Sequence, residues 1–203
     1  MEVLAPSGSA TAVGRAEGID WALIGGMAVS VRTEPRFTRD VDLAVSVPGD
    51  EQAEAVIKRL VAEGYRVKSI VEQQAAGRIA TVRLRYDGAA EEPYVDLLFA
   101  SSGIEDQIVE AAEELEVLPG VSLKVATAEH LLATKILAAG DARPQDRADA
   151  LALATTLDRT GVERARRALA EIDSRGFGRG RDLAQLLSET LANQPAAPPD
   201  PGS

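Results

Sequence analysis

The chain has no cysteine and only one histidine in 203 residues. Disulfide bonds and thiolate metal sites are therefore excluded, and a zinc site, which relies on His and Cys ligands, is not expected. No apolar run approaches the about 20 residues that a membrane-spanning helix needs, and the first 15 residues lack the basic-then-apolar order of a signal peptide. We therefore expect a cytoplasmic protein that makes no membrane contact.

Basic residues are outnumbered, since 22 Lys and Arg against 32 Asp and Glu give a net charge of −10. This charge argues against a broad surface that wraps nucleic acid. The balance changes towards the C-terminus, where residues 159–203 hold seven arginines and six acids, which leaves 15 basic and 26 acidic groups for the rest of the chain. A polyanionic substrate could therefore still find a local basic wall in this region.

The length and composition set limits on the domain organisation. Hydrophobic residues at 45% and charged residues at 27% are typical of a soluble globular protein, and 203 residues can bury a substantial core. The last ten residues contain four prolines, which is typical of a disordered tail. We expect a core over residues 1–125, a helical region over residues 126–193 and a disordered tail over residues 194–203.

Residues 23–45 are the most informative stretch. An apolar run ends at Gly25 and Gly26, a short helix of small residues follows, and a second apolar run carries Asp40 and Asp42. Alternate residues of a strand point to the same face, so the two carboxylates are expected side by side, where their repulsion calls for a cation. Such oxygen ligands suit Mg²⁺, and glycines before a helix let backbone N–H groups approach phosphates. The alternatives are a plain strand-to-helix turn and an acidic solvent face of a strand.

These residues carry a resemblance to a known family. Gly25 and Gly26, followed by residues 36–43 (RFTRDVDL), are similar to the signature of the polymerase-beta-type nucleotidyltransferase superfamily. The Arg-x-Thr-x-Asp-x-Asp form most resembles the bacterial AbiEii/AbiGii-type nucleotidyltransferase toxins. The resemblance implies an α/β (α+β) fold, in which a mixed sheet is flanked by helices and followed by a helical C-terminal half.

A third carboxylate, Asp96, interrupts the short apolar strand expected at residues 94–99. An unpaired buried carboxylate costs several kcal/mol, so a cation or hydrogen-bond donor is expected beside it. In the family resembled, an acidic residue on a strand next to the Asp pair completes the metal site and can act as general base. The alternative is an outward-facing residue on an edge strand.

Two further segments are candidates for the site. Lys135 lies in the apolar stripe of a helix expected at residues 128–139, either as an amine that reaches solvent past its neighbours or, as the resemblance implies, as a contact for the nucleotide phosphates. Asp146 and Asp149 open the next helix, where acids complement the helix dipole. Because residues 143–149 resemble a Lys/Arg-x-Asp-x-x-Asp motif of the family, Asp146 and Arg147 are secondary candidates.

The hydrophobic pattern predicts the remaining elements. Apolar residues at helical spacing predict a helix at residues 51–63, alternation predicts a strand at residues 79–86, and many acids on one face predict a helix at residues 104–115. The other strands are expected at residues 21–24, 41–47, 65–71 and 121–125, and the other helices at residues 12–18, 26–32 and 161–173, from residue 143 onwards, and at residues 181–191.

The resemblance implies transfer of a nucleoside monophosphate from an NTP to an acceptor, with two Mg²⁺ ions held by Asp40, Asp42 and Asp96. The acceptor would be the 3′ end of tRNA, which makes the protein a toxin with a cognate antitoxin, or a small molecule such as an aminoglycoside-type antibiotic. A non-catalytic nucleotide-binding regulator and a structural module are the alternatives from other classes. The residues expected to bind nucleotide are Gly25, Gly26, Arg36, Thr38, Lys135, Asp146 and Arg147.

Overall fold

The fold is taken from a computed structural model that describes residues 19–38, 40–74, 76–87, 93–140 and 143–194. Three features expected from the sequence lie outside these residues: the helix at residues 12–18, Arg39 of the RFTRDVDL segment, and all of the expected tail except Gln194. Within the described residues, no helix is long and apolar enough to cross a membrane.

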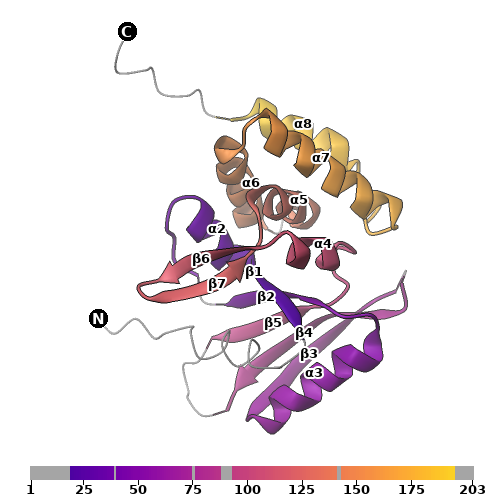
Figure 1. Ribbon diagram of the computed structural model, residues 1–203. Coiled ribbons are helices and arrows are strands. Elements are labelled where there is room, and N and C mark those ends of the chain that lie inside the picture. The colour runs from indigo at the N-terminus through magenta and orange to yellow at the C-terminus, as the bar shows by residue number, and fades with distance from the viewer. Residues whose placement is uncertain (1–18, 39, 75, 88–92, 141–142, 195–203) are drawn as a thin grey trace.

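Seven strands form one mixed sheet in the order β3-β4-β5-β2-β1-β7-β6 (Figure 1). The pairs β2–β5 and β1–β7 are parallel, and the other neighbours are antiparallel. This arrangement agrees with the α/β (α+β) fold expected from the sequence. The strands are β1 (Asp20–Ile24), β2 (Val41–Ser46), β3 (Tyr65–Gln73), β4 (Arg78–Tyr86), β5 (Tyr94–Leu98), β6 (Glu113–Leu118) and β7 (Val121–Val125).

Helices cover both faces of the sheet (Figure 1). One face carries α3, whose apolar side is buried, while α2 and α4 lie on the other face below the C-terminal helices. Contacts of α2 with α5 and α6 join the sheet to this helical part. The helices are α2 (Gly25–Arg32), α3 (Asp50–Ala62), α4 (Glu105–Glu110), α5 (Ala128–Ala138), α6 (Pro144–Thr156), α7 (Arg159–Ser174) and α8 (Leu183–Ala192).

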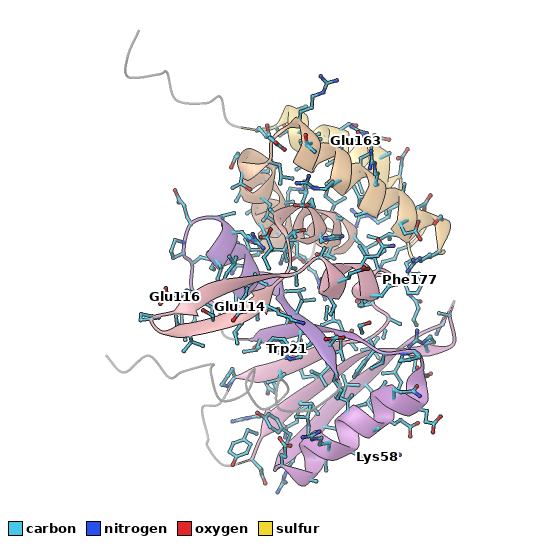
Figure 2. The ribbon with its side chains drawn as sticks, in the orientation of Figure 1. Trp21, Lys58, Glu114, Glu116, Glu163 and Phe177 are labelled. Carbon is cyan, nitrogen blue, oxygen red and sulfur yellow. The ribbon has the colours of Figure 1, made fainter. Side chains whose placement is uncertain are left out.

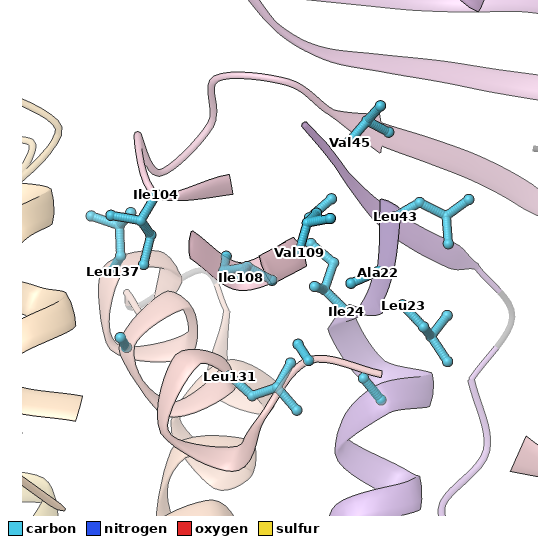
Figure 3. Close-up of a cluster of buried hydrophobic side chains, with 14 of the residues drawn as sticks. Ala22, Leu23, Ile24, Leu43, Val45, Ile104, Ile108, Val109, Leu131 and Leu137 are labelled. Carbon is cyan, nitrogen blue, oxygen red and sulfur yellow. The ribbon is translucent and has the colours of Figure 1, made fainter. Parts of the chain in front are cut away.

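The core lies between β1, β2 and the helices above them. Ala22 and Ile24 point from β1 towards α4, whereas Leu43 points to the opposite side of the sheet (Figure 3). All three side chains are buried, and Ile108 of α4 and Leu131 of α5 are buried with them. Because side chains on both faces of β1 and β2 are buried, a shift of register by one residue would move each of them to the wrong face, so the register is strongly specified.

The expected helix at residues 104–115 is wrong beyond Glu110. Helix α4 ends there, and residues from Glu113 onwards form β6, which pairs antiparallel with β7. Glu114 and Glu116 project outwards (Figure 2), while Leu115 and Val117 pack against the core. The turn at Pro119 and Gly120 closes a hairpin, and the burial of alternate residues in that hairpin outweighs the helix propensity of the glutamates.

Candidate active site

Four side chains from neighbouring strands form one row across the sheet. In the register of the strands, Ile24 of β1 lies opposite Asp42 of β2, Asp42 opposite Asp96 of β5, and Asp96 opposite Arg83 of β4. Residues that lie directly opposite each other in neighbouring strands share a face of the sheet. Two carboxylates and a guanidinium therefore meet on the face that carries α2, and Asp40 precedes β2 by one residue.

Gly25 allows the carboxylate of Asp42 to approach the start of α2. The φ angle of Gly25 is +68°, and a Cβ atom at this position would lie 1.8 Å from Oδ2 of Asp42. Any other residue would combine backbone strain with a severe clash. The backbone N–H of Gly26 donates a hydrogen bond to the same carboxylate. The glycine pair is thus a strand-to-helix turn that is also shaped around Asp42.

The environment of Asp42 disfavours its charged form. Burial, together with the nearby carboxylates of Asp96 and Asp40, raises the pKa of Asp42 from 3.8 to about 6, although Lys135 and the N–H of Gly26 act in the opposite direction. A raised carboxyl pKa in a polar site marks a place where a cation would be bound favourably. Asp42 is therefore a candidate ligand for a cation.

Arg83 supplies the cation that the sequence predicts beside Asp96. Its Nε and Nη2 donate to the two carboxylate oxygens of Asp96 at 2.8 and 2.6 Å, and Nη2 also donates to Oδ2 of Asp40 at 3.2 Å. Asp96 is only 8% exposed and lies on an interior strand, which rules out an outward-facing residue on an edge strand. We call Asp40, Asp42, Asp96 and Arg83 the carboxylate cluster.

Sequence reasoning missed Arg83, although the signal was present. The alternation of β4 places Arg83 on the polar face of that strand together with Thr81 and Arg85. An unpaired carboxylate in a neighbouring apolar strand requires a cationic partner, and an arginine on the polar face of the adjacent strand can provide it. Only the strand register distinguishes Arg83 from Arg85 as the partner of Asp96.

A second group of charges lies between α5, α6 and the segment after α2. Nζ of Lys135 donates to Oδ1 of Asp146 at 2.7 Å and lies 2.8 Å from Oδ2 of Asp149. Arg36 donates from Nε and Nη2 to the two oxygens of Asp149 at 2.9 and 2.7 Å. We call Arg36, Lys135, Asp146 and Asp149 the paired cluster, because each charge in it has an opposite partner.

The paired cluster favours the charged forms of Asp149 and Lys135. Burial opposes ionisation of Asp149, but hydrogen bonds from Arg36, Lys135 and Gln145 outweigh it and lower the pKa of Asp149. Burial likewise opposes the charge of Lys135, and its bonds to Asp146 and Asp149 outweigh that effect and raise the pKa of Lys135. With its side chain only 12% exposed, Lys135 is not an amine reaching into solvent.

The structure brings most of the expected nucleotide-binding residues together. Arg36 and Thr38 pack against Gly26, where an added Cβ atom would lie 2.8 Å from Nη2 of Arg36 and 2.9 Å from Oγ1 of Thr38. Lys135 lies close enough to Asp42 to lower its pKa, so the two clusters adjoin. Arg147 is different: it is exposed on α6, and it makes no ion pair with any described residue.

The donor set fits a divalent cation at Asp40 and Asp42 better than at Asp96. The charged form of Asp42 is disfavoured and would gain from a bound cation, whereas both oxygens of Asp96 are already bonded to Arg83. Within the described ranges, no group of three or more acidic or histidine side chains is arranged to hold a metal ion. Hard oxygen ligands of this kind suit Mg²⁺.

Comparison with known proteins gives one family match. The profile of the family described as "Nucleotidyl transferase AbiEii toxin, Type IV TA system" matches residues 11–200. No curated protein matches the chain.

Several solved structures resemble the fold distantly. A lincomycin-bound lincosamide antibiotic adenylyltransferase, LnuA, is 17% identical, with a TM-score of 0.43 over 68% of this chain and 88% of its own. The antibiotic-resistance factor ANT(2'')-Ia is 18% identical, with a TM-score of 0.44 over 91% of this chain and 86% of its own. JHP933 from Helicobacter pylori is 15% identical, with a TM-score of 0.41 over 91% of this chain and 85% of its own.

Proposed function

Because the chain belongs to the AbiEii nucleotidyltransferase toxin family, we propose that it transfers a nucleoside monophosphate from an NTP to a hydroxyl acceptor with release of pyrophosphate. The observation that carries this proposal is the row of Asp42, Asp96 and Arg83 beside the glycine turn that opens α2. The carboxylates of this row would bind a cation beside the N-terminus of α2, which favours anions.

The carboxylate cluster would bind Mg²⁺, with Asp40 and Asp42 as the oxygen donors that fit best. Bound Mg²⁺ would align the α-phosphate and neutralise charge on the leaving pyrophosphate oxygens. Asp96 faces the same space and would orient the acceptor hydroxyl and receive its proton. The bidentate contact from Arg83 holds the carboxylate of Asp96 in one orientation for this role.

The NTP phosphates would lie between the glycine turn and the paired cluster. Gly25 and Gly26 open α2, and the N-terminus of a helix favours anions. Lys135 and Arg36 lie near the same turn and would donate hydrogen bonds to phosphate oxygens in addition to those they give to Asp146 and Asp149. Phe37, which follows Arg36, is 80% exposed and offers an aromatic face on which a nucleobase can stack.

We propose the 3′ end of an RNA such as tRNA as the acceptor, in keeping with the toxin family. Four of the seven arginines in residues 159–181 are paired with acids, but Arg159 of α7 and Arg179 and Arg181 of the segment before α8 form no ion pair with any carboxylate in the described part of the chain. Burial lowers the pKa of Arg179, and the neighbouring charges of Arg143 and Arg181 lower it further. A phosphate group would relieve this repulsion between like charges.

A small cationic acceptor, such as an aminoglycoside, is the second candidate. It is favoured by the excess negative charge of the carboxylate cluster, where three carboxylates face one guanidinium. The amino groups of such an acceptor could pair with these carboxylates once the NTP is bound. A non-catalytic regulator is a weaker alternative, because Asp40, Asp42 and Asp96 are all present.

The decisive experiment is to incubate purified protein with each labelled NTP and Mg²⁺, together with total tRNA or an aminoglycoside panel. Labelled RNA supports the first candidate, and a labelled aminoglycoside supports the second. Asp42→Asn protein serves as the matched inactive control. Absence of label from both acceptor classes with every NTP would contradict the proposed transferase activity.

The toxin role has its own test. Expression of the wild-type protein should arrest bacterial growth, expression of Asp42→Asn protein should not, and a cognate antitoxin should relieve the arrest. Growth arrest by both proteins would show that any toxicity is independent of nucleotide transfer.

A further inference from the structure

The two clusters differ in net charge. In the carboxylate cluster, Asp40, Asp42 and Asp96 face the single positive charge of Arg83, which leaves two negative charges when all three acids are ionised. In the paired cluster, the charges of Lys135 and Arg36 match those of Asp146 and Asp149. One divalent cation would balance a net charge of two negative units.

Arg83 is held in place from several sides. Two of its nitrogens bond both oxygens of Asp96, one of them also bonds Asp40, and the guanidinium carbon lies 5.1 Å from the centre of the Tyr94 ring. Bidentate arginine–carboxylate pairs have a defined geometry, and a guanidinium keeps its proton under all ordinary conditions. The cluster thus contains a permanent positive charge bonded to Asp96, the carboxylate that the family resemblance implies as a metal ligand.

We propose that Arg83 acts as a built-in second cation, so that Asp40 and Asp42 of the free protein bind one divalent cation and Asp96 is not a metal ligand. This inference rests on the proposed nucleotidyl transfer and makes Arg83 a positioning residue for Asp96. It replaces the expectation that Asp40, Asp42 and Asp96 together hold two Mg²⁺ ions. A second divalent cation could bind Asp96 only by displacing Arg83.

The charge balance gives distinct expectations for two variants. Arg83→Gln removes the positive charge and frees both oxygens of Asp96, so a second cation site should form. The double change Arg83→Gln with Asp96→Asn removes one positive and one negative charge. It keeps the net charge of the cluster and both carboxylates of Asp40 and Asp42, of which only Asp40 loses a 3.2 Å bond from Arg83, so it should bind one cation with about the affinity of the wild type.

The test is a titration of nucleotide-free full-length protein with Mn²⁺, followed by electron paramagnetic resonance of the free ion. We expect one site in the wild type, two in Arg83→Gln and one in the double variant, with the double variant within about threefold of wild-type affinity. Arg85→Gln is the matched control, because Arg85 is two residues away on the same strand and also lies over the Tyr94 ring, at 5.8 Å. It should keep one site.

Two sites in the wild type, or none, would overturn the inference. So would a loss of more than about tenfold in Mn²⁺ affinity in the double variant, because that would make Asp96 a ligand. If Arg83→Gln does not fold, the wild type and the double variant still test the inference, because the double variant leaves no unpaired charge at these two positions. A merely structural ion pair predicts no change in the number of sites in Arg83→Gln.

The titration contains no NTP and no acceptor, so it separates this inference from the proposed function. A protein that binds one Mn²⁺ but labels no acceptor would support the role of Arg83 and count against the transferase. A protein that labels an acceptor and binds two Mn²⁺ ions without nucleotide would support the transferase and overturn the role of Arg83.

Discussion

The carboxylate cluster and the paired cluster adjoin each other and are built from the same kinds of side chain, yet their charge balance differs. Lys135 and Arg36 neutralise Asp146 and Asp149, and Asp149 is only 2% exposed. Arg83 neutralises only part of the charge of Asp40, Asp42 and Asp96. The paired cluster is neutral in the folded chain, whereas the carboxylate cluster has an excess of negative charge that a bound cation would balance.

The pKa values reflect this difference. Burial, followed by the charges of Asp96 and Asp40, raises the pKa of Asp42 to about 6. In Asp149, the hydrogen bonds from Arg36, Lys135 and Gln145 outweigh burial, and its pKa is lowered. The fold disfavours the charged form of Asp42, as expected of a group that binds a ligand. It favours the charged form of Asp149, as expected of a structural ion pair.

The largest expected effect is the loss of nucleotide transfer when a carboxylate is removed from the carboxylate cluster. Asp42→Asn and Asp40→Asn should each lower kcat by at least about a thousandfold, on the order of 4 kcal/mol, because the cation loses a ligand. Both proteins should remain folded, since neither change leaves a new unpaired charge. Radiolabel transfer and circular dichroism are the measurements. Retention of more than a tenth of wild-type activity by either variant would remove that residue from the site.

The next effect concerns stability and the paired cluster. Asp149→Asn leaves Arg36 and Lys135 facing a neutral side chain in a buried place, so it should lower the free energy of unfolding by about 3–5 kcal/mol. Asp42→Asn should not destabilise the metal-free protein. Urea unfolding of both variants tests the contrast directly. Equal losses of stability would mean that both clusters are structural.

A smaller effect is a pH dependence that comes from Asp42. Its folded-state pKa is raised from 3.8 to about 6, so the stability contributed by its protonated form is present at low pH and is lost as the pH rises through about 6. At about 1.4 kcal/mol per pKa unit, the total change is about 3 kcal/mol.

The comparison of the wild type with Asp42→Asn isolates this contribution. Without metal, the two proteins should be about equally stable at pH 4, and Asp42→Asn should be the more stable at pH 7. Mg²⁺ should stabilise the wild type at pH 7 and leave Asp42→Asn unchanged. A stability difference that does not vary between pH 4 and pH 7 would contradict the raised pKa.

The smallest effect on catalysis is expected at Lys135, where the two clusters meet. Lys135→Ala should raise the KM for NTP about tenfold, or about 1.4 kcal/mol, because a phosphate contact is lost, while Arg36 still pairs with Asp149. Lys58→Ala, which removes an exposed lysine from its pair with Glu54, is the control and should change neither KM nor stability. A loss of stability in Lys135→Ala with unchanged KM would confine the lysine to a structural role.

Much of this architecture follows from local patterns. The apolar runs and their alternation predict β1, β2, β4, β5 and β7, because burial of one or both faces imposes a period of two on a strand. Residues 104–115 mislead, because the acidic residues suggest a helix face although Glu114 and Glu116 alternate with Leu115 and Val117 as in a strand. Over so few residues, the alternation is a weaker signal than helix propensity. The strand is stabilised by its pairing with β7, which the local pattern does not show.

The sequence alone determined that Asp40, Asp42 and Asp96 require partners, since carboxylates in or beside apolar strands need a cation or a hydrogen-bond donor whatever the topology. It also determined that Gly25 and Gly26 mark a turn next to them. Only the tertiary structure decided which cations these acids receive. Arg83 and Asp96 meet because β4 and β5 pair in one register, and Lys135 meets Asp149 because α5 packs on α6. Contacts between distant segments depend on register and packing, which no local pattern of residues encodes.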